Sequence, residues 1–145
     1  MSILDISEKP SSRRKAVAEG RILLSQRSLN AIKGGEVRKG DPFEVARAAG
    51  LLAIKRVPEM IPHCHTIPIA HATIEFKVRD EGVSCCCTVE ATYKTGVEME
   101  ALAGAAAALL TLWDMLKYLE KDEEGQYPTM EICSLKVLRK EKQDG

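Results

Sequence analysis

Alternation of apolar and polar residues predicts four β-strands in this chain of 145 residues. Residues 67–78 and 83–94 place an apolar or small side chain at every second position, which is typical of strands with one buried face. The turn at residues 80–82 lies between them, so the two strands are expected to form a hairpin. Gly20 is a candidate bulge. The other two predicted strands are residues 15–25 and residues 129–139.

Capping signals predict a long helix after Asp41. Asp41 is a good N-cap, Pro42 suits the first helical position, and Pro58 ends the apolar spacing that follows. A shorter helix over residues 28–33 is expected before it, ending at the glycine pair of residues 34–35.

A second long helix is expected after Thr95. Thr95 and Glu98 are three residues apart and predict a capping box. No proline occurs from Ala101 to Tyr118, so about six turns are expected. Residues 105–110 are apolar all round, which indicates that this helix is buried over most of its girth.

The order of the main elements is strand, helix, strand, strand, helix, strand. This order predicts an α+β, ferredoxin-like fold, with one antiparallel sheet and helices on one face. The length is that of a single domain, residues 1–145. Residues 1–14 lack periodicity and are expected to form a mobile arm, and residues 140–145 a flexible, charged tail.

Charge and composition narrow the functional classes. Basic and acidic residues number 21 each, so no global field favours nucleic acid or a membrane surface as a partner. The chain is 45% hydrophobic and 29% charged, as in ordinary globular proteins. We find no signal peptide and no apolar run long enough to span a bilayer, and therefore expect a cytoplasmic protein. Its basic residues occur in clusters that suit a compact anion, although scattered surface lysines would look similar.

The cysteines and histidines do not predict a metal site. Residues 85–87 are three consecutive cysteines, and neighbouring strand residues point to opposite faces. His63, Cys64 and His65 invite a zinc interpretation, but adjacent residues rarely converge on one metal and no second ligand group has zinc spacing. The two histidines suit hydrogen bonding or acid–base roles better, because imidazole titrates near neutral pH.

Charged residues collect at the two ends of the second long helix. Glu98 and Glu100 lie at its start, and Asp114 and Lys117 lie near its finish. Fourteen positions separate Glu100 from Asp114, roughly 21 Å along a straight helix. The two ends therefore serve different sites, or a second copy of the chain brings its opposite end alongside. Asp114 and Lys117 can pair on one face, and a plain solvated ion pair is the alternative.

Three functional classes fit the predicted fold. An RNA-binding sheet needs stacking aromatics, but the central strands offer only Phe76 and Tyr93 and the chain is 4% aromatic. A regulatory ligand-binding dimer is harder to exclude. Lys39 precedes a helix N-terminus, where phosphate binds well. Together with the histidines and the charged residues at the helix ends, it favours proton transfer on an anionic substrate.

Several blocks of the sequence resemble one family. They are Lys39-Gly40-Asp41, Ile61-Pro62-His63-Cys64-His65, the run from Thr95 to Leu102, and Asp114-Met115-Leu116-Lys117. Together, over about residues 5 to 140, they resemble the molybdenum cofactor biosynthesis protein C family, the cyclic pyranopterin monophosphate synthases. The resemblance implies conversion of 3′,8-cyclo-7,8-dihydro-GTP to cyclic pyranopterin monophosphate with release of pyrophosphate. It also implies a ferredoxin-like subunit in a homohexamer, a trimer of dimers, with active sites between subunits.

The resemblance also implies roles for individual residues. The catalytic group would be Asp114, Lys117 and Lys39. The substrate-binding group would be His63, Cys64, His65, Glu98, Met99, Glu100, Lys9, Arg14 and Lys140. No redox cofactor is implied, and Mg²⁺ with the triphosphate is left open. A sensor oligomer that binds a nucleotide or pterin without catalysis is the alternative.

This chain departs from the usual family pattern at several positions. The family usually has leucine at position 63, proline at position 66 and tyrosine at position 113, where this chain has His63, Thr66 and Trp113. The family's glycine-rich tail is replaced by charged residues after Lys140, which bears on the role of that lysine.

Overall fold

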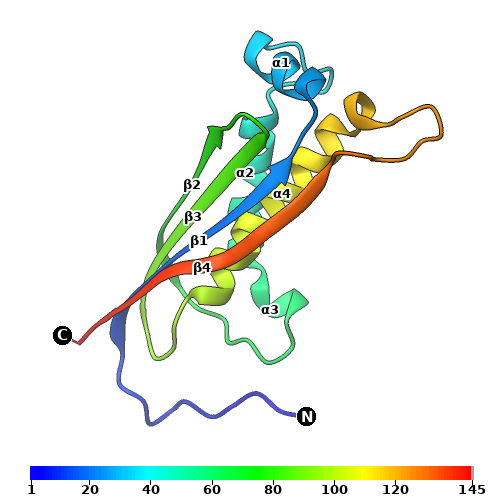
Figure 1. Cartoon of the computed structure of the whole chain (residues 1–145). Helices are drawn as coiled ribbons and strands as arrows, with labels where there is room; N and C mark the ends of the chain where they lie inside the picture. The colour runs from blue at the N-terminus through cyan, green and yellow to red at the C-terminus, as the bar shows by residue number, and fades with distance from the viewer. Residues whose placement is uncertain (145) are drawn as a thin grey trace.

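The computed structural model describes residues 1–144 and has an α+β fold. Within these residues one antiparallel sheet has the strand order β2-β3-β1-β4 (Figure 1). The strands are β1 (Ser12–Leu23), β2 (Ile69–Val78), β3 (Gly82–Tyr93) and β4 (Glu131–Gln143). The helices are α1 (Gln26–Gly34), α2 (Pro42–Lys55), α3 (Val57–Met60) and α4 (Glu98–Glu120). The predicted ferredoxin-like order is confirmed.

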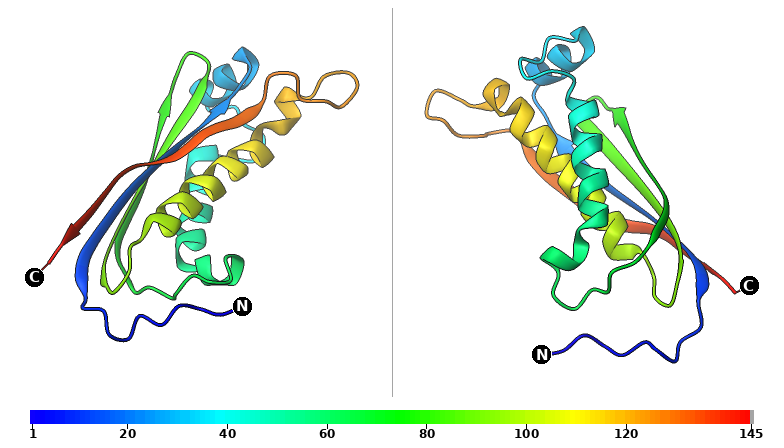
Figure 2. Two further views of the ribbon diagram at one scale, coloured as in Figure 1. Left: turned by 60° about the horizontal axis from the view of Figure 1, so that its bottom comes forward. Right: turned by 180° about the vertical axis from the view of Figure 1, so that it is seen from behind.

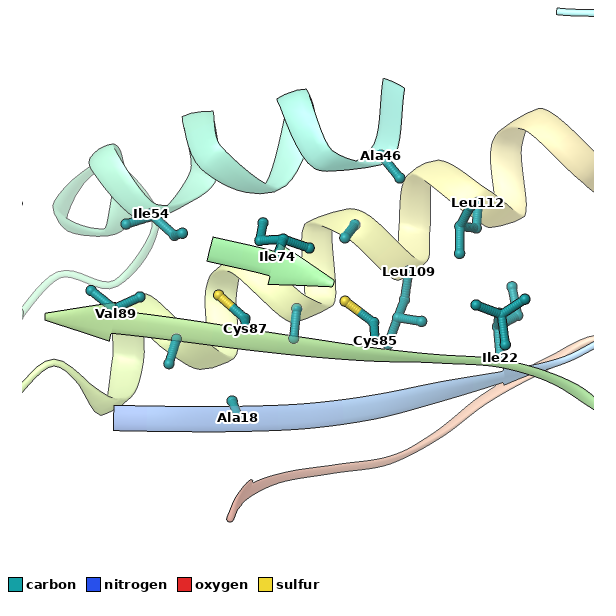
Figure 3. Close-up of a cluster of buried hydrophobic side chains, with 14 of the residues drawn as sticks. Ala18, Ile22, Ala46, Ile54, Ile74, Cys85, Cys87, Val89, Leu109 and Leu112 are labelled. Atoms are coloured by element: carbon teal, nitrogen blue, oxygen red, sulfur yellow. The ribbon is translucent and has the colours of Figure 1, made fainter. Parts of the chain in front are cut away.

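The two long helices cover one face of the sheet (Figure 2). The buried side chains of β3 alternate as predicted, and Cys85 and Cys87 are fully buried while Cys86 faces the other way. They lie in the core with Ile74, Val89 and the apolar residues of α2 and α4 (Figure 3). Burial raises the pKa of the Cys85 and Cys87 thiols to about 12, so these cysteines are unreactive packing residues.

Glycine permits the close packing of α2 on α4. A Cβ atom at Gly104 would lie 2.7 Å from the sulfur of Cys87 and 2.8 Å from the side chain of Ile54. At Gly50 on α2, a Cβ atom would lie 2.8 Å from the carbonyl oxygen of Gly104. The two helices therefore approach at a pair of glycines, which explains a poor helix former inside α4.

The middle of α4 belongs to the core. Ala105, Ala108, Leu109 and Leu112 are fully buried. Contrary to the sequence-based expectation, α4 is long and apolar enough to cross a membrane. Half of its most apolar stretch of 18 residues is buried inside the fold, so these apolar residues serve packing.

The start of α4 differs from the prediction. The N-cap is Val97, no side chain caps it, and Glu98 is the first helical residue. The predicted Thr95–Glu98 capping box is therefore wrong, because the helix begins two residues later than that box requires. The side chain of Glu98 instead pairs with Lys140, with 3.7 Å between the carboxylate oxygen and the ammonium nitrogen. Asp41, by contrast, caps α2 as predicted, through the amides of Phe43 and Glu44.

The chain ends are more regular than predicted. Strand β1 starts at Ser12, inside the predicted arm, and residues 1–11 form no helix or strand. The mobility of these residues stays a prediction. The predicted flexible tail is wrong for residues 140–143, which pair with β1 as part of β4. Gly145 lies outside the described residues.

A bulge lies opposite Gly20, but the prediction of Gly20 as the bulge residue is wrong. The pairing of β1 with β4 shifts between Glu19 and Arg21, and the extra residue is on β4. There Ser134 adopts a positive φ of 57°, in the left-handed region. Gly20 itself is needed for packing, since a Cβ atom would lie 2.6 Å from Leu109. Beyond a second shift between Val17 and Ala18, β4 stays paired with β1 up to Gln143.

Candidate active site

Ten of the twelve residues predicted for the site fall into two groups at opposite ends of α4. One group, here called the lysine–aspartate end, lies in the last turns of α4 beside the loop before α2: Lys39, Asp114 and Lys117. The other, here called the histidine end, surrounds the start of α4 beside the loop after α3: Lys9, His63, Cys64, His65, Glu98, Met99 and Glu100. Figures 1 and 2 show the two loops at opposite ends of this helix.

At the lysine–aspartate end, two ammonium groups share one carboxylate. Asp114 Oδ1 lies 2.9 Å from Lys117 Nζ, and Asp114 Oδ2 lies 3.3 Å from Lys39 Nζ. Lys39 also donates to the carbonyl oxygen of Asp114 at 3.1 Å. Lys39 and Asp114 are exposed and Lys117 is half-buried, so the cluster has one excess positive charge at the surface. Such a surface suits an anionic ligand.

The pairing fixes the charge states of these groups. The hydrogen bond from Lys117 and then that from Lys39 hold the pKa of the Asp114 carboxyl below its usual value. The hydrogen bond to Asp114 and its negative charge raise the pKa of the Lys117 amine. Lys117 is therefore held as an ammonium, which can donate a proton but cannot accept one until it has lost that proton.

Local backbone signals place Lys39 in this cluster. Gly35 ends α1 in the left-handed region, with φ of 67°, and Gly40 has φ of 112°. Asp41 then caps α2 and fixes the start of that helix. The loop between the two glycines turns back over the last turns of α4. The sequence predicted where α1 ends and where α2 begins. The contact of Lys39 with Asp114 depends in addition on tertiary packing, which the sequence does not show.

At the histidine end, the residues line a cavity of about 550 Å³. Seven of its lining residues were predicted from the sequence, and they are the ones named above for this end. The sequence analysis missed Ser2, Leu4 and Ile6, which line the same cavity from the N-terminal segment. Residues 1–14 lack periodicity, so the sequence carried no signal for this contact.

A buried carboxyl lies in this cavity. Glu100 is 3% exposed, and burial raises the pKa of its carboxyl. Burial also raises the pKa of the Cys64 thiol, and the negative charge of Glu100 adds to the effect. Cys64 is thus a thiol rather than a nucleophilic thiolate, and Glu100 takes up a proton more readily than an exposed glutamate does.

Backbone carbonyls of the N-terminal segment engage both histidines. The ring of His63 is hydrogen-bonded to the carbonyl oxygen of Ser2. His65 Nε2 donates to the carbonyl oxygen of Leu4 at 2.7 Å. Lys94 donates to the carbonyl oxygen of Ser7 at 3.1 Å. The segment is therefore held across the histidine end at three points.

Arg14 and Lys140 lie beside this cavity rather than in its lining. Arg14 is 8% exposed, donates to the carbonyl oxygen of Lys94 at 3.3 Å, and has no described partner for its buried Nε. Lys140 reaches the start of α4 through its pair with Glu98. Both cations thus lie near the N-terminus of α4, which itself favours an anion.

Comparisons with known proteins identify the family of this chain. The model of the MoaC family matches residues 3–143. The chain belongs to the MoaC family. A relative from Sulfurisphaera tokodaii is 52% identical over 95% of this chain and 91% of its own length, and one from Aeropyrum pernix is 51% identical over 97% and 96%. A relative from Thermococcus onnurineus is 46% identical over 100% of this chain and 93% of its own. All three are named probable cyclic pyranopterin monophosphate synthase.

Metal ligation does not explain the polar clusters of this MoaC family chain. Within residues 1–144, no three His, Cys, Asp or Glu side chains gather closely enough to hold a metal ion. Asp114 and Glu98 instead pair with lysines, and Glu100 is buried. The absence of a resident cofactor stays a prediction.

Proposed function

We propose that this chain is a cyclic pyranopterin monophosphate synthase of molybdenum cofactor biosynthesis. It would convert 3′,8-cyclo-7,8-dihydro-GTP to cyclic pyranopterin monophosphate and release pyrophosphate. Membership of the MoaC family supports the reaction class. The observation that carries the proposal is the cluster in which Lys39 and Lys117 share the Asp114 carboxylate, because such a cluster can bind phosphate and transfer protons.

The lysine–aspartate end handles protons and leaving-group charge. Lys117 is held as an ammonium by Asp114 and acts as the general acid. Once it has given its proton, the neutral amine is a base beside a carboxylate that favours reprotonation. Lys39 stabilises negative charge on the phosphates as pyrophosphate leaves.

The histidine end binds the purine-derived rings. Glu100 and Glu98 accept or donate hydrogen bonds at ring nitrogens, and Met99 supplies an apolar contact at the mouth of the cavity. His65 would exchange its bond to the Leu4 carbonyl for one to substrate. Lys9 lines the cavity, and Arg14 with Lys140 extends the cationic surface toward the triphosphate.

One chain cannot bring its two ends to one small substrate. Glu100 and Asp114 are roughly 21 Å apart along α4. A second copy must therefore place its lysine–aspartate end beside the histidine end of the first. We propose the homohexamer, a trimer of dimers, that the family resemblance implies. The protein would act in the cytoplasm on a small molecule, without nucleic acid or membrane.

The reaction needs no redox cofactor, since it rearranges bonds and releases pyrophosphate. Mg²⁺, if required, would arrive with the triphosphate, because the described residues offer no dedicated ligand cluster.

The direct test is turnover of freshly made cyclo-dihydro-GTP by the purified protein. Pyrophosphate and, after oxidation, pterin fluorescence are followed together, and we expect equal amounts of both. The variant Asp114→Ala should lose turnover, while Lys33→Ala, which removes an exposed lysine from α1, should keep it. Tight binding of substrate without turnover would contradict the synthase assignment and favour the sensor alternative.

A further inference from the structure

Tyr118 connects α4 to the loop that carries Lys39. The backbone N–H of Arg38 donates to the hydroxyl oxygen of Tyr118 at 2.7 Å. The guanidinium carbon of Arg38 lies 4.5 Å from the centroid of the Tyr118 ring. Arg38 is thus held twice by one side chain, at its amide by the hydroxyl and at its guanidinium by the ring face.

The contact between Arg38 and Tyr118 lies one helical turn from the contact between Lys39 and Asp114. Tyr118 lies four residues after Asp114, so both side chains project from the same face of α4, one turn apart. Arg38 and Lys39 are consecutive in the loop and reach these two positions: Arg38 meets Tyr118, and Lys39 meets Asp114. Two adjacent attachments fix how far the Lys39 ammonium lies from the Asp114 carboxylate.

The rest of the loop holds residue 38 weakly. Val37 is buried, but its neighbours Glu36, Arg38 and Lys39 are exposed. The loop's own hydrogen bonds join Glu36 to Ala31 and Gly40 to Val37, and among the described residues Tyr118 is the acceptor for the Arg38 amide. Lys39 has a long flexible stem, so an unanchored loop would let its ammonium sample many positions.

We propose that Tyr118 is a positioning residue for Lys39. Its hydroxyl and ring fix Arg38 so that the next residue presents its ammonium to Asp114 and to the phosphates of the substrate. This role rests on the proposed function, in which Lys39 stabilises charge on the leaving pyrophosphate. Tyr118 acts through Lys39 and touches no reacting atom.

A double-mutant cycle tests the proposal. Tyr118→Phe keeps the ring and removes the acceptor of the Arg38 amide, and we expect kcat/KM to fall by about 3- to 10-fold, as for one lost hydrogen bond. In the Lys39→Ala background the same change should alter kcat/KM by less than about 2-fold, because nothing remains to be positioned. An equal loss in both backgrounds, or no loss in either, would overturn the proposal.

Thr111→Val is the matched control. It also removes one hydroxyl from α4, but that hydroxyl donates to the carbonyl oxygen of Ala107 in the same helix. We expect it to leave kcat/KM within about 2-fold of the parent protein, since it does not contact the loop. A loss as large as that of Tyr118→Phe would show a general effect on α4 and would overturn the proposal.

A measurement without turnover separates this inference from the proposed function. Lysines are labelled with acetic anhydride, and the rate at Lys39 is compared with that at exposed Lys33 in the same sample. We expect Tyr118→Phe to raise the relative rate at Lys39 and to speed hydrogen exchange at the Arg38 amide. If the parent protein lacks synthase activity, the proposed function fails, yet this result still decides the role of Tyr118. Unchanged labelling and exchange would overturn it.

Discussion

The two ends of α4 use charge in opposite ways. At the lysine–aspartate end the carboxylate is exposed, has two ammonium partners, and has a lowered pKa. At the histidine end the carboxyl of Glu100 is buried and has a raised pKa, and the cavity around it is covered by the N-terminal segment. One end therefore keeps its carboxylate ionised in water, while the other shields a carboxyl that takes up a proton more readily.

Under the proposed function, this contrast separates two tasks. Phosphate binding and proton delivery would use the fixed charges of the lysine–aspartate end, at little burial cost. Ring recognition would use the shape and the shielded hydrogen-bonding groups of the cavity at the histidine end. A helix with a wholly apolar middle keeps the two environments apart, because Leu109 and Leu112 belong to the core.

The largest effect is expected at the lysine–aspartate end. Lys117→Ala removes the general acid and should lower kcat by about 10²- to 10⁴-fold. Lys117 is half-buried and its contact is a surface ion pair, so circular dichroism and oligomer size should not change. Steady-state kinetics of pyrophosphate release measure the effect, with Lys33→Ala as the control. Retained turnover in Lys117→Ala would remove this lysine from the mechanism.

The next effect concerns the middle of α4, which links the two ends. Gly104→Val would push a side chain into Cys87 and Ile54, and overpacking of this kind costs about 1–3 kcal/mol or more. Thermal melts should show a Tm lower by several degrees. Gly34→Val is the control, because a Cβ atom there meets only the flexible side chain of Glu36. Equal melting of both variants would contradict the close packing of α2 on α4.

The pH dependence of stability should distinguish the two carboxyl groups. The folded-state pKa of Glu100 is raised above the ordinary value of 4.5, so between these two pKa values the folded chain binds more protons than the unfolded chain. Stability therefore falls as pH rises from 4.5 through the folded-state pKa. Glu100→Gln removes this penalty and should raise Tm at neutral pH while lowering activity.

Asp114 should behave in the opposite sense. Its folded-state pKa is lowered below the ordinary value of 3.8, so its contribution is present above that pH and is lost as pH falls through the lowered pKa. Asp114→Asn should leave Tm nearly unchanged, because the group is exposed and surface ion pairs contribute little. Melting curves from pH 2 to pH 8 compare the two variants, and a lower Tm for Glu100→Gln at neutral pH would contradict the account.

The smallest effect is expected where the N-terminal segment crosses the histidine end. His63→Leu, which restores the residue usual in the family, removes the bond to the Ser2 carbonyl. Hydrogen exchange at residues 3–6 should become faster, while KM changes by about 2- to 5-fold, the range for one exposed hydrogen bond. His71→Leu, on β2 and away from the cavity, is the control. Unchanged exchange would show that His63 does not hold this segment.

Periodicity and caps were enough to predict most of the fold. Alternation placed Cys85 and Cys87 on the buried face, and the Asp41 cap located α2. The Thr95 cap failed because α4 begins after Val97 without any side-chain cap, and Glu98 pairs with Lys140 across the fold instead of capping the helix. The paired residues 140–143 were missed because their charged side chains look like a solvated tail, although β1 supplies hydrogen-bonding partners for their backbone.

The site was less predictable than the fold. The Asp114–Lys117 pair followed from helical spacing, and the family motifs identified the residues of the cavity. The contact of Lys39 with Asp114 and the hold of Tyr118 on Arg38 required tertiary packing of a loop on a helix. The bonds from His63 and His65 to backbone carbonyls have no sequence signal, because every residue carries a carbonyl.

The central claim is that one active site combines opposite ends of α4 from two copies of the chain. Complementation between two inactive variants tests it most directly. Lys117→Ala and His65→Ala chains with different tags are co-expressed, and oligomers that carry both tags are purified. We expect about a quarter of parental turnover, since random assembly into a symmetric oligomer leaves that share of interfaces with both ends intact. Mixed oligomers as inactive as each variant alone would contradict the shared site.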